Sequence, residues 1–358
     1  MVCVAAFIIL LVVGVFVAFI SIFKPKIGKK YLKVLKRSWG CFGKRITLQK
    51  CETGFGDDVK NTLLGKVAAT KPKLVKPLSV TIEVASILIV VITAWSLIEG
   101  VKAGLALWSL GTCNVKHASA CTLGAEVCSI DDNTEPQNIF DSIGLWFSDW
   151  GEIFGAFPDK FRSWDTANFD FKGITTNHDE GDYYAIDIFD PGCEVCLLSF
   201  RTQLESNFFT DHKVLLVPFP IQDEGGKFKF KNSEMIVRYI LAAYRNGEPK
   251  DAKDDADSVA FQIIKRIYTE KNSEGIYWQT VFNDYYNGEQ TEEELTKWLE
   301  EFGYNEDERS QIKEAVSSDA VSDMIKQNND LVVNNIHAKG IPTMIYEGRK
   351  HTGKYEVK

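Results

Sequence analysis

The sequence predicts an α/β domain with a helical insertion, preceded by two transmembrane helices. Two long apolar stretches lie near the N-terminus, a strand–turn–helix–strand pattern begins at Tyr183, and helical patterns fill residues 233–335. At 358 residues the chain is too long for one average domain. The expected parts are a transmembrane helix at 1–23, a basic cytoplasmic loop at 24–78, a second transmembrane helix at 79–108, an extracytoplasmic linker at 109–181 and the α/β domain at 182–358.

The first apolar stretch, Met1 to Phe23, contains no charged residue and is long enough to cross the hydrocarbon core of a bilayer as a helix. A cleaved signal peptide would carry its positive charge before the apolar run. Here the basic Lys24-Pro25-Lys26 follows the run instead. We therefore expect a retained anchor.

The second apolar stretch has its core at Val80 to Leu97, with Glu83 as its only charge. A helix buried in a protein core is the alternative interpretation.

Between the two stretches, residues 24–78 hold 15 Lys and Arg against 3 Asp and Glu. Short loops rich in Lys and Arg stay in the cytoplasm. We therefore expect both chain termini and everything after the second stretch to lie outside the cytoplasm of a plasma membrane, with the lipid bilayer as a partner.

The charge of the remaining chain is acidic. Residues 100–358 hold 26 Lys and Arg against 44 Asp and Glu. Binding to phosphate backbones requires clustered cations. Nucleic acid is therefore not expected as a partner.

The cysteines outside the α/β domain divide along the same predicted topology. Cys41 and Cys51 fall in the cytoplasmic loop, where thiols stay reduced, whereas Cys113, Cys121 and Cys128 lie on the oxidising side. The spacing of Cys113, His117 and Cys121 resembles a metal site, but one disulfide among the three linker cysteines is the plainer interpretation. The cysteine left over could pair with another chain. No metal is expected.

Within the linker, aromatic and aliphatic residues recur at helical spacing from Ile139 to Phe154. The polar residues Asp165 to Asp182 are typical of a connection. Tyr183 to Phe189 then predicts a strand, Asp190-Pro191-Gly192 a turn, Cys193 to Phe209 a helix and Val214 to Phe219 a buried strand. Helices are expected at Ser233, at Ser258 to Tyr268, after an N-cap at Thr291, and at Ser317 to Ile336. A hairpin is expected near the C-terminus, at 343–357.

The candidate reactive site is a pair of cysteines in the motif Cys193-Glu194-Val195-Cys196. Two cysteines three residues apart at a helix start bring their sulfurs close enough to bond. The helix N-terminus favours the thiolate of Cys193, so attack through a mixed disulfide becomes feasible near neutral pH. We expect Cys193 to be the partly exposed, attacking thiolate and Cys196 the buried, resolving thiol. A haem attachment site would need His where Leu197 stands, and zinc would need a second pair of ligands. Half a zinc site and a purely structural disulfide remain the alternatives.

A second element near the C-terminus makes a family resemblance specific. The strand–Cys-x-x-Cys–helix unit and Gly340-Ile341-Pro342-Thr343 resemble the thioredoxin superfamily, and the helical insertion at about 233–335 resembles its DsbA-like branch. The resemblance covers residues 182–358. It implies a cis-proline at Pro342 facing the cysteine pair, with Ile341, Pro342 and Thr343 binding an extended substrate segment.

Asp187 lies six residues before Cys193, in an otherwise apolar strand where the family places a buried carboxylate. A buried carboxylate has a raised pKa and can accept a proton from Cys196. A strand-edge Asp facing solvent is the alternative, and Asp190 is expected to be a turn residue. Glu194 and Val195 are expected to tune the redox potential, which should fall between roughly −270 and roughly −120 mV.

The resemblance implies a membrane-anchored extracytoplasmic oxidoreductase that oxidises or isomerises cysteines of exported proteins. It needs no cofactor beyond a redox-active disulfide, and it needs a membrane redox partner that recycles the cysteine pair. Two alternatives stay open: a reductase for cofactor or cytochrome assembly, and a redox-silent thioredoxin-fold scaffold or metallochaperone.

Overall fold

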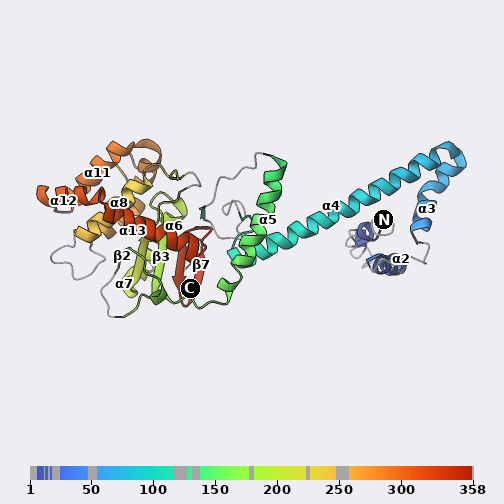
Figure 1. Cartoon of the computed structure of the whole chain (residues 1–358), viewed down its shortest axis with the longest axis horizontal. Coiled ribbons are helices and arrows are strands. Elements are labelled where there is room, and N and C mark those ends of the chain that lie inside the picture. The colour runs from blue at the N-terminus through green and yellow to red at the C-terminus, as the bar shows by residue number, and fades with distance from the viewer. Residues whose placement is uncertain are drawn as a thin grey trace. The chain divides into compact units, whose positions relative to one another are not determined.

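The computed structural model describes residues 6–11, 13, 14, 17, 25–46, 55–115, 127–130, 138–176, 181–222, 226–246 and 258–356 (Figure 1). The chain divides into two compact units, Met1–Val101 and Lys102–Lys358. The first unit holds helices α2 (Pro25–Ile46) and α3 (Phe55–Thr70) and most of α4 (Val75–Leu110). The second unit holds the sheet and the remaining helices.

In the first unit, α2 presents an apolar stripe on an otherwise basic helix. Phe7 is buried and packs on the rings of Trp39 and Phe42, with ring centroids 5.2 and 4.6 Å apart. Cys41 is also buried, against Ala6, Leu10 and Val59. The expected span at 1–23 lies largely outside the described residues.

Helix α4 agrees with the second expected span. Residues Pro72–Leu110 form the one stretch among the described residues that is long and apolar enough to cross a membrane, with a mean hydropathy of 2.2 in its most apolar window. Only 6% of that window is buried. A soluble core helix is mostly buried, so the low burial favours the membrane over the core alternative.

The second unit is built on a five-stranded sheet in the order β2-β4-β3-β6-β7. The strands are β2 (Ile174–Thr175), β3 (Ala185–Phe189), β4 (Val214–Pro218), β6 (Thr343–Tyr346) and β7 (Arg349–Thr352). The central strand β3 runs parallel to β4 and antiparallel to β6, and every residue of β3 and β4 is buried. A separate two-stranded sheet joins β1 (Cys128–Ser129) to β5 (Gly340–Ile341).

Helices connect and cover these strands. Helix α6 (Glu194–Glu205) and the short α7 (Phe208–Asp211) link β3 to β4, and this β-α-β unit was expected from the sequence. The insertion consists of the following helices: α8 (Ser233–Asn246), α9 (Val259–Thr269), α10 (Trp278–Thr280), η6 (Val281–Tyr285), α11 (Gly288–Glu301), α12 (Glu306–Val316), α13 (Asp319–Asp330) and η7 (Leu331–Asn335). In Figure 1, α8, α11 and α12 gather at one end of the strands.

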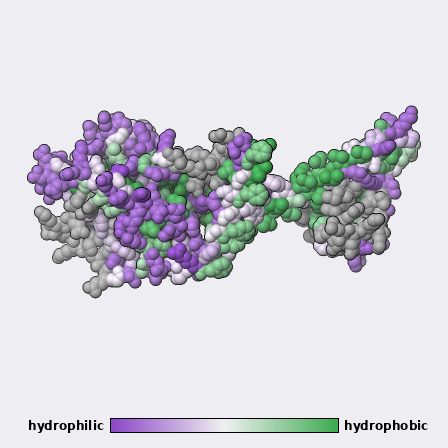
Figure 2. Space-filling model, viewed as in Figure 1, coloured by the Kyte–Doolittle hydropathy of each residue, from purple (hydrophilic) through white to green (hydrophobic). Residues whose placement is uncertain are grey.

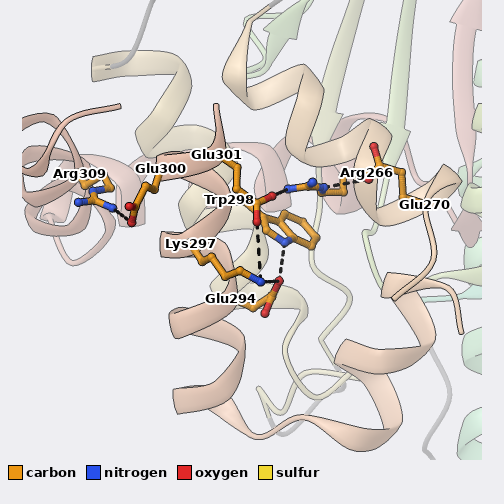
Figure 3. Close-up of polar contacts among 8 residues, drawn as sticks. All are labelled: Arg266, Glu270, Glu294, Lys297, Trp298, Glu300, Glu301 and Arg309. Atoms are coloured by element: carbon orange, nitrogen blue, oxygen red, sulfur yellow. Dashed lines mark hydrogen bonds and ion pairs between the residues drawn. The ribbon is translucent and has the colours of Figure 1, made fainter. Parts of the chain in front are cut away.

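Trp298 of α11 is the largest fully buried side chain of the insertion. Its indole nitrogen donates to Glu294 at 2.8 Å, and the Arg266 guanidinium lies 5.0 Å from its ring centroid. The Arg266 guanidinium also forms ion pairs with Glu270, at the end of α9, at 2.9 Å and with Glu301 of α11 at 2.6 Å (Figure 3). The apolar ring is thus covered by a cation that is itself held by two carboxylates.

Helix α5 (Ile139–Gly155) follows the expected aromatic periodicity, but its apolar face is not buried in a core. Phe140 is 83% exposed and Phe147 64% exposed. Its other face packs on the last turns of α4, where Lys102 pairs with Asp149 at 2.6 Å and Trp108 contacts Phe157. Figure 2 shows apolar residues along both α4 and α5.

Two boundaries differ from the sequence analysis. The sheet begins at β2, within the range 109–181 that was expected to be a linker, and Trp164 and Phe171 belong to the same core. Helix α11 begins four residues earlier than expected because Asn287, rather than Thr291, is its N-cap and forms a capping box with Gln290. Thr291 is therefore inside the helix.

Candidate active site

Cys193 lies where the central strand turns into a helix. It is the N-cap of α6, directly after the turn that Asp190, Pro191 and Gly192 form at the end of β3. The turn packs tightly against the segment just before α8: a Cβ on Gly192 would lie 2.4 Å from the Phe230 side chain. The strand and the turn therefore fix where the Cys193 sulfur points.

The disulfide at this site differs from the expected one. Cys193 bonds Cys128, 65 residues earlier, with their Cα atoms 6.2 Å apart, and Cys196 is free and buried. Cys193 is therefore fully buried, whereas a partly exposed thiolate was expected. The reason is that residues 127–130, here called the Cys128 segment, cover it. One disulfide was expected among Cys113, Cys121 and Cys128, with the cysteine left over available to another chain, whereas Cys128 bonds Cys193 of this chain.

The Cys128 segment lies along the Gly340–Pro342 loop. Strand β1 pairs antiparallel with β5, with Cys128 opposite Ile341 and Ser129 opposite Gly340. The Ile341–Pro342 peptide is cis, as the resemblance implied. The Cys193 sulfur lies 3.8 Å from the carbonyl oxygen of Ile341, so the loop and the reactive sulfur face each other. The Thr343 hydroxyl instead turns inward and donates to the Gly340 carbonyl at 2.6 Å.

Cys196 lies one helical turn after Cys193, on the buried side of α6. Burial raises the pKa of its thiol well above the ordinary value, and the negative charges of Asp190 and Asp187 raise it further. The thiol therefore keeps its proton at neutral pH. To attack a neighbouring sulfur it must give that proton to a base.

Asp187 is buried in the middle of β3, opposite Met344 of β6. Gln203 donates to its Oδ2 at 2.8 Å, and its Oδ1 accepts no hydrogen bond from the described residues. Burial raises the pKa of this carboxyl to about 7, and the Gln203 hydrogen bond lowers it only in part. The solvent-facing alternative is thereby excluded, and the carboxyl can take up a proton near neutral pH.

Asp190 is also fully buried, which the turn assignment missed. Its carboxylate accepts hydrogen bonds from the Gly192 amide at 2.7 Å, the Ile221 amide at 2.7 Å and the Ser233 hydroxyl. Burial raises its pKa to about 6 despite these three donors. Asp190 thus ties the cysteine turn to the start of α8 and places a second titratable carboxyl near Cys196.

The insertion supplies two further side chains that the sequence did not single out. Gln279 donates to the carbonyl oxygens of Pro191 and Cys193, both at 2.9 Å, and Asn283 donates to that of Gly192 at 2.8 Å. Amides in a helical segment carry no motif, so no sequence signal marked them. They hold the backbone that presents Cys193.

The other residues that the sequence analysis singled out are not part of this cluster, or lie outside the described residues. Glu194 is exposed at the first position of α6, and Val195 is half-buried. Cys113 is disulfide-bonded to a partner outside the described residues, and so is Cys41. The expectation of a reduced thiol at Cys41 is therefore wrong. His117 and Cys121, which completed the metal-like spacing, also lie outside the description.

Comparisons with known proteins give structural similarity only. No family model and no curated protein matches the chain. The thiol–disulfide exchange protein alpha-DsbA2 of Wolbachia pipientis is 15% identical, with a TM-score of 0.35 over 52% of this chain and 83% of its own. A thioredoxin-like oxidoreductase from Silicibacter pomeroyi is 17% identical, with a TM-score of 0.35 over 53% and 88%. DsbA of Chlamydia trachomatis is 18% identical, with a TM-score of 0.34 over 53% and 84%.

Proposed function

We propose that this chain is a membrane-anchored thiol–disulfide oxidoreductase that exchanges disulfides with cysteines of exported proteins. Cys193 is the sulfur that forms the mixed disulfide, and Cys196 is the thiol that resolves it. One observation carries the proposal: Cys193 is bonded to a cysteine on an extended strand beside Pro342, while Cys196 waits as a free thiol behind it.

The buried carboxyls supply the proton acceptor that Cys196 needs. As the Cys196 sulfur attacks Cys193, its proton passes to Asp187, whose pKa of about 7 makes it half-ionised at neutral pH. The leaving thiolate takes a proton from solvent. Asp190 holds the Cys193 turn and adds to the negative field around Cys196. Glu194, exposed beside Cys193, opposes formation of a second negative charge and so tunes the potential.

Helices α4 and α5 support anchoring to a bilayer. The basic segment 24–78 precedes α4, and the positive-inside rule places it in the cytoplasm and the catalytic unit outside. Helix α5 packs one face on the end of α4 and leaves its aromatic face exposed, and this exposed face suits the interfacial region, where aromatic side chains are favoured. A membrane redox partner would recycle the cysteines. The disulfide at Cys41 is more typical of an oxidising compartment, which makes the orientation a point to test.

The double variant Cys128→Ser/Cys196→Ser should accumulate mixed disulfides with client proteins in cells that produce the full-length chain. Cys196 is removed because it would resolve the intermediate, and Cys128 because it also bonds Cys193. Captured clients are separated on non-reducing gels and identified by mass spectrometry.

The matched control adds Cys193→Ser to the same two changes and should capture nothing. If the folded double variant captures no more than this control, Cys193 is not the exchanging sulfur. The identity of the clients tests the orientation as well. Exported proteins are expected, and exclusively cytoplasmic clients would place the catalytic unit on the other side of the membrane.

A further inference from the structure

We infer that residues 127–130 are an internal substrate: the Cys128 segment occupies the client-binding strand position and holds Cys193 as an intramolecular mixed disulfide. The inference rests on the proposed function and deepens it. Cys128 is then a third redox-active cysteine, and its segment must leave the strand position before a client can bind there. It also indicates the kind of client strand that the site accepts.

The segment binds as an added strand. Cys128 lies opposite Ile341 and Ser129 opposite Gly340 in antiparallel register, and the Ile130 amide donates to the Lys339 carbonyl at 3.1 Å. Backbone pairing of this kind binds any extended peptide, whatever its sequence. The segment thereby puts a cysteine sulfur directly onto Cys193.

Side-chain contacts add selectivity to this backbone pairing. Val127 and Ile130 are 7% and 5% exposed, so both flanking apolar side chains are buried. A Cβ on Gly340 would lie 3.0 Å from the Val127 side chain and 3.2 Å from the Cys128 carbonyl oxygen, so the glycine allows the close approach. Lys229 donates to the Ser129 carbonyl at 3.0 Å. The preferred client is therefore an extended strand with apolar residues just before and two after its cysteine.

The free thiol behind Cys193 makes the bond exchangeable. The Cys196 thiolate attacks the Cys193 sulfur, the Cys193–Cys196 disulfide forms and the Cys193–Cys128 bond breaks. The proton of Cys196 goes to Asp187, and the Cys128 thiolate is protonated from solvent. One disulfide replaces another, so the step needs no external oxidant or reductant. In the reverse direction Cys128 competes with clients for Cys193.

The test compares reduced full-length chains challenged with the symmetrical disulfide of the peptide Val-Cys-Ser-Ile, capped at both ends. In Cys128→Ser/Cys196→Ser, Cys193 attacks the peptide disulfide and keeps one peptide, while the other leaves as a thiol. In Cys196→Ser, Cys128 displaces the bound peptide and restores the internal disulfide. An intramolecular thiol acts at an effective concentration in the millimolar range, so with free peptide thiol held at about 0.1 mM the adduct should be about tenfold lower. Acid quenching, alkylation and peptide mapping without reduction measure the adduct on Cys193 itself.

A second pair of variants tests docking without removing Cys128. Ile130→Glu in the Cys196→Ser background places a charge at a buried contact and should raise the adduct several-fold. Ile143→Glu, at a side chain of α5 that is 52% exposed, makes the same change on the surface and should leave the adduct as in Cys196→Ser.

The outcomes separate the two proposals. Equal adduct with and without Cys128 would overturn the internal substrate and leave the oxidoreductase intact. Equal adduct for Ile130→Glu and Ile143→Glu would overturn the strand docking. No adduct on the folded double variant with any peptide disulfide would overturn the proposed function itself.

Discussion

Asp190→Ala is expected to lower the free energy of unfolding by about 3 kcal/mol, because it leaves buried donors without an acceptor. The carboxylate accepts from two backbone amides and the Ser233 hydroxyl, and each buried donor left unsatisfied costs about 1–3 kcal/mol. The substitution also removes a buried carboxylate, whose ionised form is disfavoured by burial, as its raised pKa of about 6 indicates. The loss of that charge offsets part of the decrease in stability. The loss of unfolding free energy is measured by urea unfolding of the full-length chain at pH 5. At this pH the carboxyl is mostly protonated, so removal of a buried charge offsets the loss least.

Asp165→Ala is the matched control. Asp165 is exposed, and its side chain accepts only the Ala167 amide at 3.1 Å, so the same truncation should cost no more than about 1 kcal/mol. Asp190→Asn keeps one acceptor oxygen and should fall between the two. A wild-type unfolding midpoint for Asp190→Ala would show that Asp190 does not hold the cysteine turn.

The wild-type chain is expected to lose stability as the pH rises from about 4 to about 7, and Asp187→Asn should not show this loss. The unfolded carboxyl ionises near its ordinary pKa of about 3.9, whereas burial keeps the folded carboxyl protonated up to a pKa of about 7. Between these values the folded state binds more protons, so its stability falls as the pH rises. Three pKa units correspond to about 4 kcal/mol, which Asn, neutral at every pH, does not lose.

Unfolding free energies of the two chains from pH 4 to pH 8 measure this difference. The curves should meet near pH 4 and separate above it, with Asp187→Asn more stable at pH 8. Asp190 titrates near pH 6 in both chains and cancels in the comparison. Asp211→Asn, at an exposed position, should follow the wild-type curve. Parallel curves for Asp187→Asn would show that Asp187 is ionised in the folded state like an exposed carboxyl.

The central strands of the fold were predictable because they are short apolar runs bounded by turn residues, and the helices because their apolar residues recur with a helical period. The strand before Cys193, the buried strand at 214–218 and the helix that Ser258 caps are all present. The cis peptide before Pro342 followed from a family motif. By contrast, strand β2 has only two residues and shows no periodicity, so the start of the domain was placed too late.

The partner of Cys193 could not be predicted, because it depends on tertiary docking. Cys196 is three residues away and Cys128 is 65 residues away, so local spacing favoured the wrong pair. The burial of Asp190 was missed for a related reason. Asp-Pro-Gly is typical of an exposed turn, and it is buried here because Ile221, just after β4, and Ser233, at the start of α8, donate to Asp190.

The most direct test of this account is the disulfide map of the untreated full-length chain. The protein is quenched in acid, alkylated under denaturing conditions without reduction, digested and analysed by mass spectrometry. We predict a peptide containing Cys128 linked to one containing Cys193, with Cys196 alkylated. A Cys193–Cys196 link in every molecule, with Cys128 alkylated, would contradict the account.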